Sequence, residues 1–275
     1  MAGILYVVGT PIGNLGDFSP RAVEVLSSCD FIAAEDTRVT IKLLNHFGIK
    51  KPMVSYYEHN RAQRGGVIID RLLNGESCAL VSDAGMPIIS DPGEDLTRLC
   101  HENGIQIYAV PGPCAFVTAL AVSGMPSGRF TFEGFLTVSK QNRRKHLEEL
   151  VDERRTMIFY EAPHKLAATL ADMAKYWGDR KIALVKELTK IHESVERTTL
   201  FEATEKYKDG SAKGEYVLIV EGKPEEEEKE ITLEAAVEMA SALVEDGMSI
   251  NEAAKEIAKQ TGIKKSEIYK SLQNG

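Results

Sequence analysis

The sequence predicts an α/β protein with two α/β domains, a parallel sheet in the first and a mixed sheet in the second, followed by a small helical unit. Short apolar runs alternate with helical patterns along most of the chain, and two segments rich in Gly and Pro or in charge interrupt the series. A chain of 275 residues is also long for one small core, and its length favours roughly two domains. We therefore predict an N-terminal domain over 1–123, a second domain over 124–222, a charged linker over 223–230 and a helical tail over 231–275.

The first domain is predicted from strand-like runs that alternate with helical patterns. Several runs are apolar on both faces, as a parallel sheet covered on both sides requires. Ser19 followed by Pro20 is typical of a helix start, and Gly48 and Gly104 stand where helices should stop. The expected strands are Ile4–Val8, Phe31–Ala34, Met53–Tyr56, Ala79–Ser82 and Ile105–Val110, and the expected helices are Pro20–Ser28, Arg38–Phe47, Arg61–Asn74 and Glu94–Asn103.

A cluster of Gly, Pro and Ser at Ser123–Gly128 indicates the link to the second domain. Little helical pattern separates the strand expected near residue 195 from the strand expected near 216, so the second sheet is predicted to be mixed. Its expected strands are Arg129–Phe132, Thr156–Tyr160, Ile182–Lys186, Val195–Leu200 and Tyr216–Val220.

The tail is predicted to hold three helices. The first covers Leu233–Val244, and a capping box at Ser249 and Glu252 opens the second. The third begins at Ser266 and ends near Leu272. This arrangement resembles a helix-turn-helix, so the tail is either a nucleic-acid contact or an element for packing or dimerisation.

Composition excludes several classes of protein. The net charge of −8 argues against non-specific binding of nucleic acid by the whole surface, although a local basic patch is compatible with it. The four cysteines form no Cys-x-x-Cys pair, so we expect buried, reduced thiols and no metal site. The first apolar run is broken at once by Gly9 and Pro11, and no run approaches the roughly 20 residues that span a bilayer. We therefore expect a cytoplasmic protein that does not associate with membranes.

Three loops rich in Gly and Pro follow expected strands of the first sheet. They are Gly9–Asp17, Ser82–Pro87 and Val110–Cys114. None is a dinucleotide fingerprint or a P-loop, and each alone could be an ordinary tight turn. Because the carboxyl ends of parallel strands meet at one edge, the three loops are expected to outline one pocket.

Six blocks in order resemble the ribosomal RNA methyltransferases of the tetrapyrrole methylase family. The resemblance extends from about Leu5 to Gly222 and continues more loosely into the tail. Its blocks are Gly9–Leu15, Ala34–Arg38, Val81–Pro87, Val110–Pro113, Phe159–Lys165 and Lys186–Lys190.

The resemblance implies a homodimer that binds S-adenosylmethionine in a cleft between its two α/β domains. It implies 2′-O-methylation of a cytidine ribose in the decoding region of 16S rRNA, with either the rRNA or the small ribosomal subunit as partner. The cofactor residues that it implies are Pro11, Asp83, Ala84, Gly85, Ile88, Ala115, Phe116, Tyr160, Leu188 and Tyr216.

Methyl transfer to a ribose hydroxyl needs alignment and benefits from a general base, but it needs no metal. Glu58 and His59 are possible bases, but the predicted catalytic residues are Glu35, Asp36 and Glu187. Glu35 and Asp36 directly follow an expected strand, on the edge that should face the cleft. Their alternative role is to cap the helix that follows.

RNA binding calls for cations and planar groups. The predicted RNA-binding residues are Arg38, Lys42, His59, Asn60, Arg143 and Arg144. The last two belong to a block of positive charges at 140–146. That block favours phosphate contact because it is not interleaved with acids, but it could also be a solvated helix face balanced by Glu148 and Glu149.

Two other functions remain open at the level of sequence. The first is a small-molecule methyltransferase of the same fold that acts on a corrin or porphyrin precursor. The second is a non-enzymatic regulator that binds nucleic acid through the terminal helices.

Overall fold

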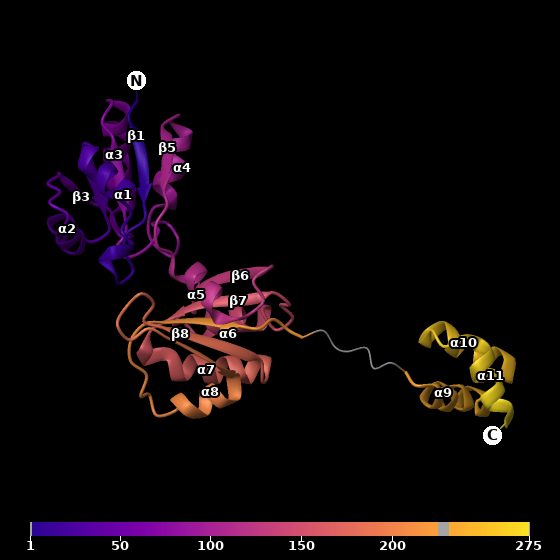
Figure 1. Ribbon diagram of the computed structural model, residues 1–275. Coiled ribbons are helices and arrows are strands. Elements are labelled where there is room, and N and C mark those ends of the chain that lie inside the picture. Colours follow the sequence, from indigo (N-terminus) through magenta and orange to yellow (C-terminus); the bar gives the residue numbers. More distant parts are fainter. Residues whose placement is uncertain (1, 225–230, 275) are drawn as a thin grey trace. The chain divides into compact units, whose positions relative to one another are not determined.

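The computed structural model describes residues 2–224 and 231–274, and the chain divides into two compact units, Met1–Pro224 and Glu225–Gly275 (Figure 1). Most of the predicted charged linker, residues 225–230, lies outside the described residues. No helix in the described part of the chain has the length and apolar character needed to cross a bilayer.

The first unit begins with a five-stranded sheet whose strands are all parallel, in the order β3-β2-β4-β1-β5. The predicted parallel sheet is thus confirmed. Its strands are β1 (Ile4–Val8), β2 (Phe31–Ala34), β3 (Met53–Ser55), β4 (Cys78–Val81) and β5 (Gln106–Val110).

Helices cover both faces of this sheet, which explains why β2 and β4 are buried at every position. Ser19 caps the first helix through its side chain, and Pro20 is the first helical residue, as predicted. Two hydrophobic clusters form on opposite sides of the strands, one around Phe31 and Leu80 and the other around Ile32 and Val81. The elements are η1 (Leu15–Asp17), α1 (Pro20–Ser28), α2 (Thr37–His46), α3 (Arg61–Leu73) and α4 (Glu94–Glu102).

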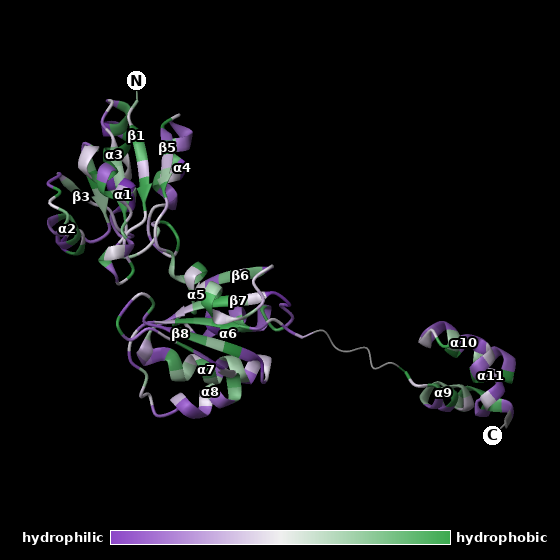
Figure 2. Cartoon of the chain, in the orientation of Figure 1, coloured by the Kyte–Doolittle hydropathy of each residue, from purple (hydrophilic) through white to green (hydrophobic). Residues whose placement is uncertain are grey.

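The second sheet is mixed, as predicted, with the order β6-β7-β10-β8-β9. Strand β6 is parallel to β7, whereas β10 is antiparallel to both β7 and β8, and β9 is antiparallel to β8. Strands β7, β8 and β10 are hydrophobic along most of their length, while exposed helix faces are hydrophilic (Figure 2). The strands of this sheet are β6 (Phe130–Phe135), β7 (Thr156–Glu161), β8 (Lys181–Lys186), β9 (Ser194–Thr199) and β10 (Tyr216–Val220).

Helix α8 (Leu200–Tyr207) connects β9 to β10, where the sequence showed little helical pattern. It is a short helix that buries only Leu200 and Ala203, so it leaves a weak apolar periodicity. Thr199 caps it by accepting a hydrogen bond from the Glu202 backbone. The other helices that cover this sheet are α6 (Lys140–Glu149) and α7 (Pro163–Trp177), whose apolar side chains pack with those of β7, β8 and β10.

Helix α5 (Ala115–Ser123) was not predicted, and its residues were assigned to the first domain. Its Ala119 and Leu120 pack with Ile158, Ala183 and Ile219 of the second sheet. The helix is apolar nearly all round, so it lacks the one-sided periodicity by which surface helices are recognised. We therefore propose that the second domain begins near residue 115 rather than at 124.

The tail is a separate three-helix unit with its own core. Its helices are α9 (Leu233–Glu245), α10 (Ile250–Thr261) and α11 (Lys265–Asn274), close to the predicted bounds. The predicted capping box is present, with Ser249 and Glu252 each bonding the backbone of the other. Small side chains, including Ala236, Ala240 and Ala253, fill the contact between helices and are fully buried.

Candidate cofactor site

The three loops rich in Gly and Pro converge at the carboxyl edge of the first sheet, as predicted. The Gly9 amide donates to Val110 O over 3.1 Å, and Thr10 exchanges two backbone hydrogen bonds with Gly85, of 2.8 and 3.1 Å. A Cβ built on Gly9 would lie 2.7 Å from the Cα of Gly112. Glycine is therefore required at position 9 by the close approach of two backbones rather than by its φ angle.

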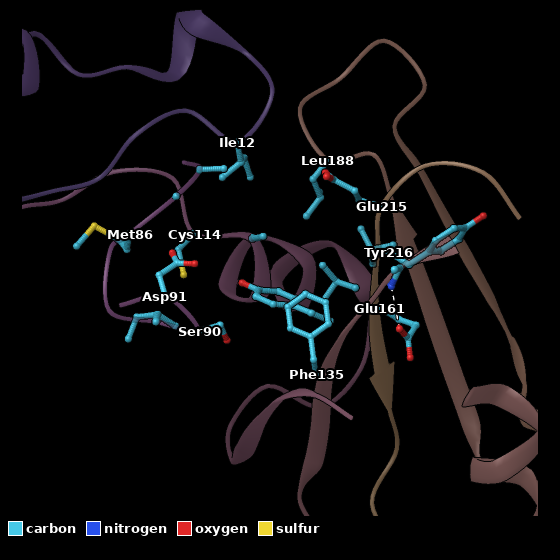
Figure 3. Close-up of a pocket in the computed structure, with 18 of the residues that line it drawn as sticks. Ile12, Met86, Ser90, Asp91, Cys114, Phe135, Glu161, Leu188, Glu215 and Tyr216 are labelled. Carbon is cyan, nitrogen blue, oxygen red and sulfur yellow. Dashed lines mark hydrogen bonds between the residues drawn. The ribbon is translucent and has the colours of Figure 1, made fainter. Parts of the chain in front are cut away.

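A cavity of about 410 Å³ opens beside these loops, within the size range of small-molecule sites (Figure 3). One wall comes from the first-domain loops and from the start of α5, and the other comes from β6, β7, β8 and β10 of the second sheet. The lining residues are Ile12, Ala84, Gly85, Met86, Ile89, Ser90, Asp91, Cys114, Ala115, Phe135, Tyr160, Glu161, Ala162, Pro163, Val185, Leu188, Glu215, Tyr216 and Val217.

Six of the ten predicted cofactor residues line this cavity. They are Ala84, Gly85, Ala115, Tyr160, Leu188 and Tyr216. The first two come from the loop after β4, and the other four come from α5, from β7 and β10, and from the loop after β8.

The other four lie next to the cavity without lining it. Pro11 and Asp83 directly precede the lining residues Ile12 and Ala84. Ile88 packs against the core of the first sheet, and Phe116 stacks on Phe132 with ring centroids 4.4 Å apart. The motif blocks thus include loops that border the cavity, but they did not specify which side chain of each loop turns inward.

Sequence reasoning missed the three carboxylates of the wall, Asp91, Glu161 and Glu215 (Figure 3). Asp91 follows the predicted loop by only a few residues, so its place at the same sheet edge was the available signal. Glu161 belongs to the Phe159–Lys165 block, and it is buried with its carboxylate accepting from the Ala162 amide and the Thr169 hydroxyl. Glu215 directly precedes β10, at a position that no motif marks.

Backbone strain is concentrated around the cavity. Four non-glycine residues in the described part of the chain have positive φ, and two of them, Ile88 (80°) and Thr189 (65°), are β-branched. Ile88 and Ser90 flank the lining residue Ile89, while Glu187 and Thr189 flank the lining residue Leu188. Strained residues of this kind persist where the surrounding structure fixes them, and they gather at binding sites.

The cavity wall continues into an acidic cluster formed by Asp91, Asp83 and Glu35. Burial raises the pKa of Asp91 to about 6, and the charges of Glu35 and Asp83 add to this shift. Burial and neighbouring carboxylates also raise the pKa values of Glu35 and Asp83. The Asp83 amide donates to Glu35 Oε2 over 3.4 Å, which ties the two loops together.

The three predicted catalytic acids differ in their surroundings. Asp36 caps α2 and pairs with Arg38 over 2.7 Å, and these hydrogen bonds lower its pKa to about 2. Glu187 accepts from the Glu215 amide at 2.9 Å and from Lys190 Nζ at 3.0 Å, and these bonds lower its pKa. Only the half-buried Glu35 has a raised pKa, which suits a group that must take up a proton.

Tyr160 ties helix α5 to the second sheet through its hydroxyl group. Its oxygen accepts from the Phe116 amide over 3.2 Å, so it satisfies a donor at the start of α5. Burial raises the pKa of Tyr160 to about 12, and the hydroxyl therefore stays protonated at neutral pH. Its ring packs edge-on against Phe132, at 5.0 Å between centroids, and supports the aromatic side of the cavity.

The predicted RNA-binding residues of the first domain are mostly exposed. Arg38 has 88% of its side chain exposed, and Lys42 and His59 are also exposed. Asn60 braces its own turn, because its side chain accepts from the Tyr57 amide and donates to Ser55 O.

Two cations of the basic block of α6 are paired with the acids that follow it, which favours the alternative of a charge-balanced helix face. Arg144 pairs with Glu148 over 2.7 Å, and Lys145 lies 3.6 Å from Glu149, both at i,i+4 spacing on the helix. Arg143 is only 14% exposed, and its guanidinium donates to Asp172 at 2.6 Å and to Thr169 at 2.9 Å. The geometry therefore gives Arg143 a structural role and leaves Arg144 on a charge-balanced face.

A family model of the tetrapyrrole (corrin/porphyrin) methylases matches residues 4–204. The chain belongs to the tetrapyrrole methylase family. The match covers the first domain and the second domain as far as α8, so it includes every lining residue of the cavity except Glu215, Tyr216 and Val217.

Several known proteins are similar to this chain over nearly its whole length. The ribosomal RNA small subunit methyltransferase I of Synechocystis sp. is 43% identical over 97% of this chain and 96% of its own length. The proteins of the same name from Halalkalibacterium halodurans and Escherichia coli O157:H7 are 46% and 44% identical, over 97% and 98% of this chain and 93% and 94% of their own.

Solved structures of other methylases share the fold at low identity. The uroporphyrin-III-C-methyltransferase of Thermus thermophilus superposes with a TM-score of 0.57 at 17% identity, over 80% of this chain and 94% of its own. Cobalt precorrin-4 methyltransferase superposes with a TM-score of 0.58 at 16% identity, over 79% of this chain and 94% of its own. These structural similarities support the fold. They do not identify the substrate.

Proposed function

We propose that the chain transfers a methyl group from S-adenosylmethionine to the 2′-oxygen of a cytidine ribose in the decoding region of 16S rRNA. Family membership makes the chain a methyltransferase, and its relatives at 42–46% identity are named for the small-subunit ribosomal RNA. The solved tetrapyrrole methyltransferases are far more distant, at 16% and 17% identity, which favours RNA over a corrin or porphyrin precursor.

The acidic lining of the cavity is the main support for S-adenosylmethionine as the cofactor. Asp91, Glu161 and Glu215 line it, and none of the described lining residues is Lys, Arg or His. A dinucleotide or nucleoside triphosphate would bring phosphates that find no cation there, at a high cost in unpaired charge. S-adenosylmethionine instead carries two positive charges, a sulfonium and an ammonium, and a single carboxylate. The acidic lining of the cavity therefore fits its charge.

The cavity walls also suit the uncharged parts of the cofactor. Ile12, Leu188 and Val217 offer apolar contacts, and Phe135 and Tyr160 offer aromatic faces for an adenine ring. The turn at Ala84 and Gly85 brings backbone groups to the cavity wall, where they can bond a ribose or the amino-acid portion. We assign to Asp91 the counter-charge for the cationic part of the ligand.

When bound, S-adenosylmethionine would supply a methyl group bonded to a positively charged sulfur. After transfer, that sulfur would remain as a neutral thioether. We assign to Glu35 the role of general base, because its raised pKa favours uptake of the ribose hydroxyl proton. In the proposed reaction the bond between the ribose oxygen and the methyl carbon would form, the C–S bond would break with its electron pair going to sulfur, and Glu35 would take up the proton. The closely packed backbones of the loops at Gly9 and Gly112 hold the donor side rigid, so that alignment contributes to the rate.

The experiment is transfer of labelled methyl from S-adenosylmethionine, with naked 16S rRNA, purified small ribosomal subunits and a porphyrin precursor offered in parallel. We expect label on a cytidine 2′-oxygen of the RNA. We further expect Glu35→Gln to lower kcat by about 10²–10⁴-fold while the cofactor still binds, and Glu24→Gln on the exposed face of α1 to act like wild type. Label on the porphyrin precursor alone would contradict the RNA assignment, and an unchanged kcat for Glu35→Gln would contradict the base.

We also propose that the chain forms a homodimer through α5. This nine-residue helix has no charged side chain, yet Val117 and Val122 are 48% and 45% exposed. Exposed apolar positions on such a helix are typical of an interface. Sedimentation equilibrium should give a dimer for the wild type and a monomer for Val117→Glu/Val122→Glu, and a dimer that persists in this variant would contradict the assignment.

A further inference from the structure

One face of the tail carries a groove that the cofactor site does not involve. It lies between the start of α10 and the outer face of α11. Its lining residues are Asn251, Lys264, Lys265, Ser266, Tyr269, Lys270 and Gln273. All of them can donate a hydrogen bond, three carry a positive charge, and none is acidic.

The spacing of these residues places them on one side of α11. Lys265 and Tyr269 are four residues apart, as are Ser266 and Lys270, and Gln273 follows one turn later. The opposite side of the helix buries Ile268, which packs against the Ala and Ile side chains of α9 and α10. The core of the tail therefore fixes the direction in which the three lysines point.

Charge is divided unevenly within the tail. Helix α9 contains Glu234, Glu238 and Glu245 and no basic residue, whereas Lys264, Lys265 and Lys270 lie at the groove with Glu267 as the single acid of α11. Within the described residues, none of these three lysines takes part in an ion pair. No acid stands four residues from any of these lysines, so this face keeps a net positive charge. In α6, by contrast, Arg144 and Lys145 are paired with acids at that spacing.

We propose that this groove binds the phosphate backbone of the RNA that the catalytic unit methylates, an inference that rests on the proposed function. Three ammonium groups match phosphate, and the hydroxyl of Ser266 and the side-chain amides of Asn251 and Gln273 match phosphate and 2′-hydroxyl oxygens. Tyr269 adds a partly buried ring on which a base can stack, held by a 3.0 Å hydrogen bond from Gln273 Nε2 to its hydroxyl. An acidic protein would match the lysines alone, and a membrane surface would need apolar side chains that this groove lacks.

The arrangement explains how an acidic chain recognises an anionic substrate. With a net charge of −8, long-range attraction of the whole surface is unfavourable, so a local positive face must supply the attraction. Because the tail is a compact unit on the same chain, its contact raises the effective concentration of RNA at the catalytic unit. The tail thus contributes to RNA affinity and not to the chemical step.

The test compares two double variants of the full-length chain that remove the same charge from the same unit. Lys265→Ala/Lys270→Ala alters the groove, and Lys255→Ala/Lys259→Ala removes exposed lysines of α10 outside it. Binding of transcribed 16S rRNA is measured across a salt series without methyl donor. For the groove variant, the slope of log K against log salt should fall in magnitude by roughly 1.5 to 2, with a raised KM for RNA and an unchanged kcat.

The control variant should keep the wild-type slope and KM. Equal losses in both variants would reduce the effect to net charge and overturn the proposal, as would a groove variant that binds like wild type. Since the salt series needs no methyl transfer, failure of the groove is distinguished from failure of the proposed reaction, which appears as absence of label with the wild-type chain.

Discussion

Gly9→Ala is expected to lower the free energy of unfolding by about 1–3 kcal/mol and to weaken binding of S-adenosylmethionine by about tenfold or more. The new Cβ would lie 2.7 Å from Gly112 Cα and 2.8 Å from Gly112 N, so the loops after β1 and β5 must separate. Backbone atoms cannot turn aside as a flexible side chain can. Because both loops position the residues that line the cavity, we expect the loss to appear in cofactor affinity and in thermal stability together.

Gly128→Ala is the matched control for this substitution. Gly128 also lies in a loop, but a Cβ there meets no atom within 4 Å. Calorimetric titration and thermal unfolding should give wild-type values for Gly128→Ala. Equal behaviour of the two variants would show that the contact of the two loops does not shape the site.

Affinity for S-adenosylmethionine is expected to fall by about tenfold for each pH unit below 6. The pKa of Asp91 is raised to about 6 because the carboxyl group is partly buried and lies near the charges of Glu35 and Asp83. A cationic ligand binds the ionised carboxylate of Asp91 more tightly than the protonated carboxyl. Below pH 6, Asp91 must therefore lose a proton before the ligand binds. Titrations between pH 7.5 and 5 measure this directly.

The raised pKa of Asp91 also makes the free energy of unfolding depend on pH. The folded-state pKa of Asp91 lies above the ordinary value of 3.8, so folding favours the protonated carboxyl. Its contribution to stability is present below pH 4 and is lost as the pH rises through about 6. Bound cofactor offsets this loss, and stabilisation by the ligand should therefore grow from pH 5 to pH 7.

Asp91→Asn separates this carboxyl from other titrating groups. The variant should bind weakly at pH 7 and lose the step in affinity near pH 6, whereas Asp70→Asn on the exposed face of α3 should keep both. A pH dependence that is unchanged in Asp91→Asn would assign the titration to another group.

The sequence predicted the first sheet closely because each of its elements carries a separate local signal. Buried strands such as Phe31–Ala34 are continuously apolar, and Ser19–Pro20 marks a helix start by its side-chain chemistry. Loops at strand ends were predictable as a group, since parallel topology brings them to one edge.

What the sequence could not specify depends on contacts between distant residues. Helix α5 is apolar all round, so only its packing against Ile158 and Ala183 reveals which domain it joins. Asp91 looks like a loop aspartate until its burial beside Glu35 is known. The sequence predicts Arg143 to be a free cation. In the structure its guanidinium donates a hydrogen bond to Asp172, 29 residues away.

We propose that the cavity lined by Asp91, Glu161 and Glu215 binds a cationic methyl donor. The most direct test is calorimetric titration of the full chain with S-adenosylmethionine and, in parallel, with an anionic dinucleotide. The titration is repeated on Ala84→Trp, which places a large ring at an exposed position of the cavity wall. We predict binding of S-adenosylmethionine at one site per chain, no binding of the dinucleotide, and loss of the site in Ala84→Trp. Binding of the dinucleotide, or binding of S-adenosylmethionine that Ala84→Trp leaves intact, would contradict the account.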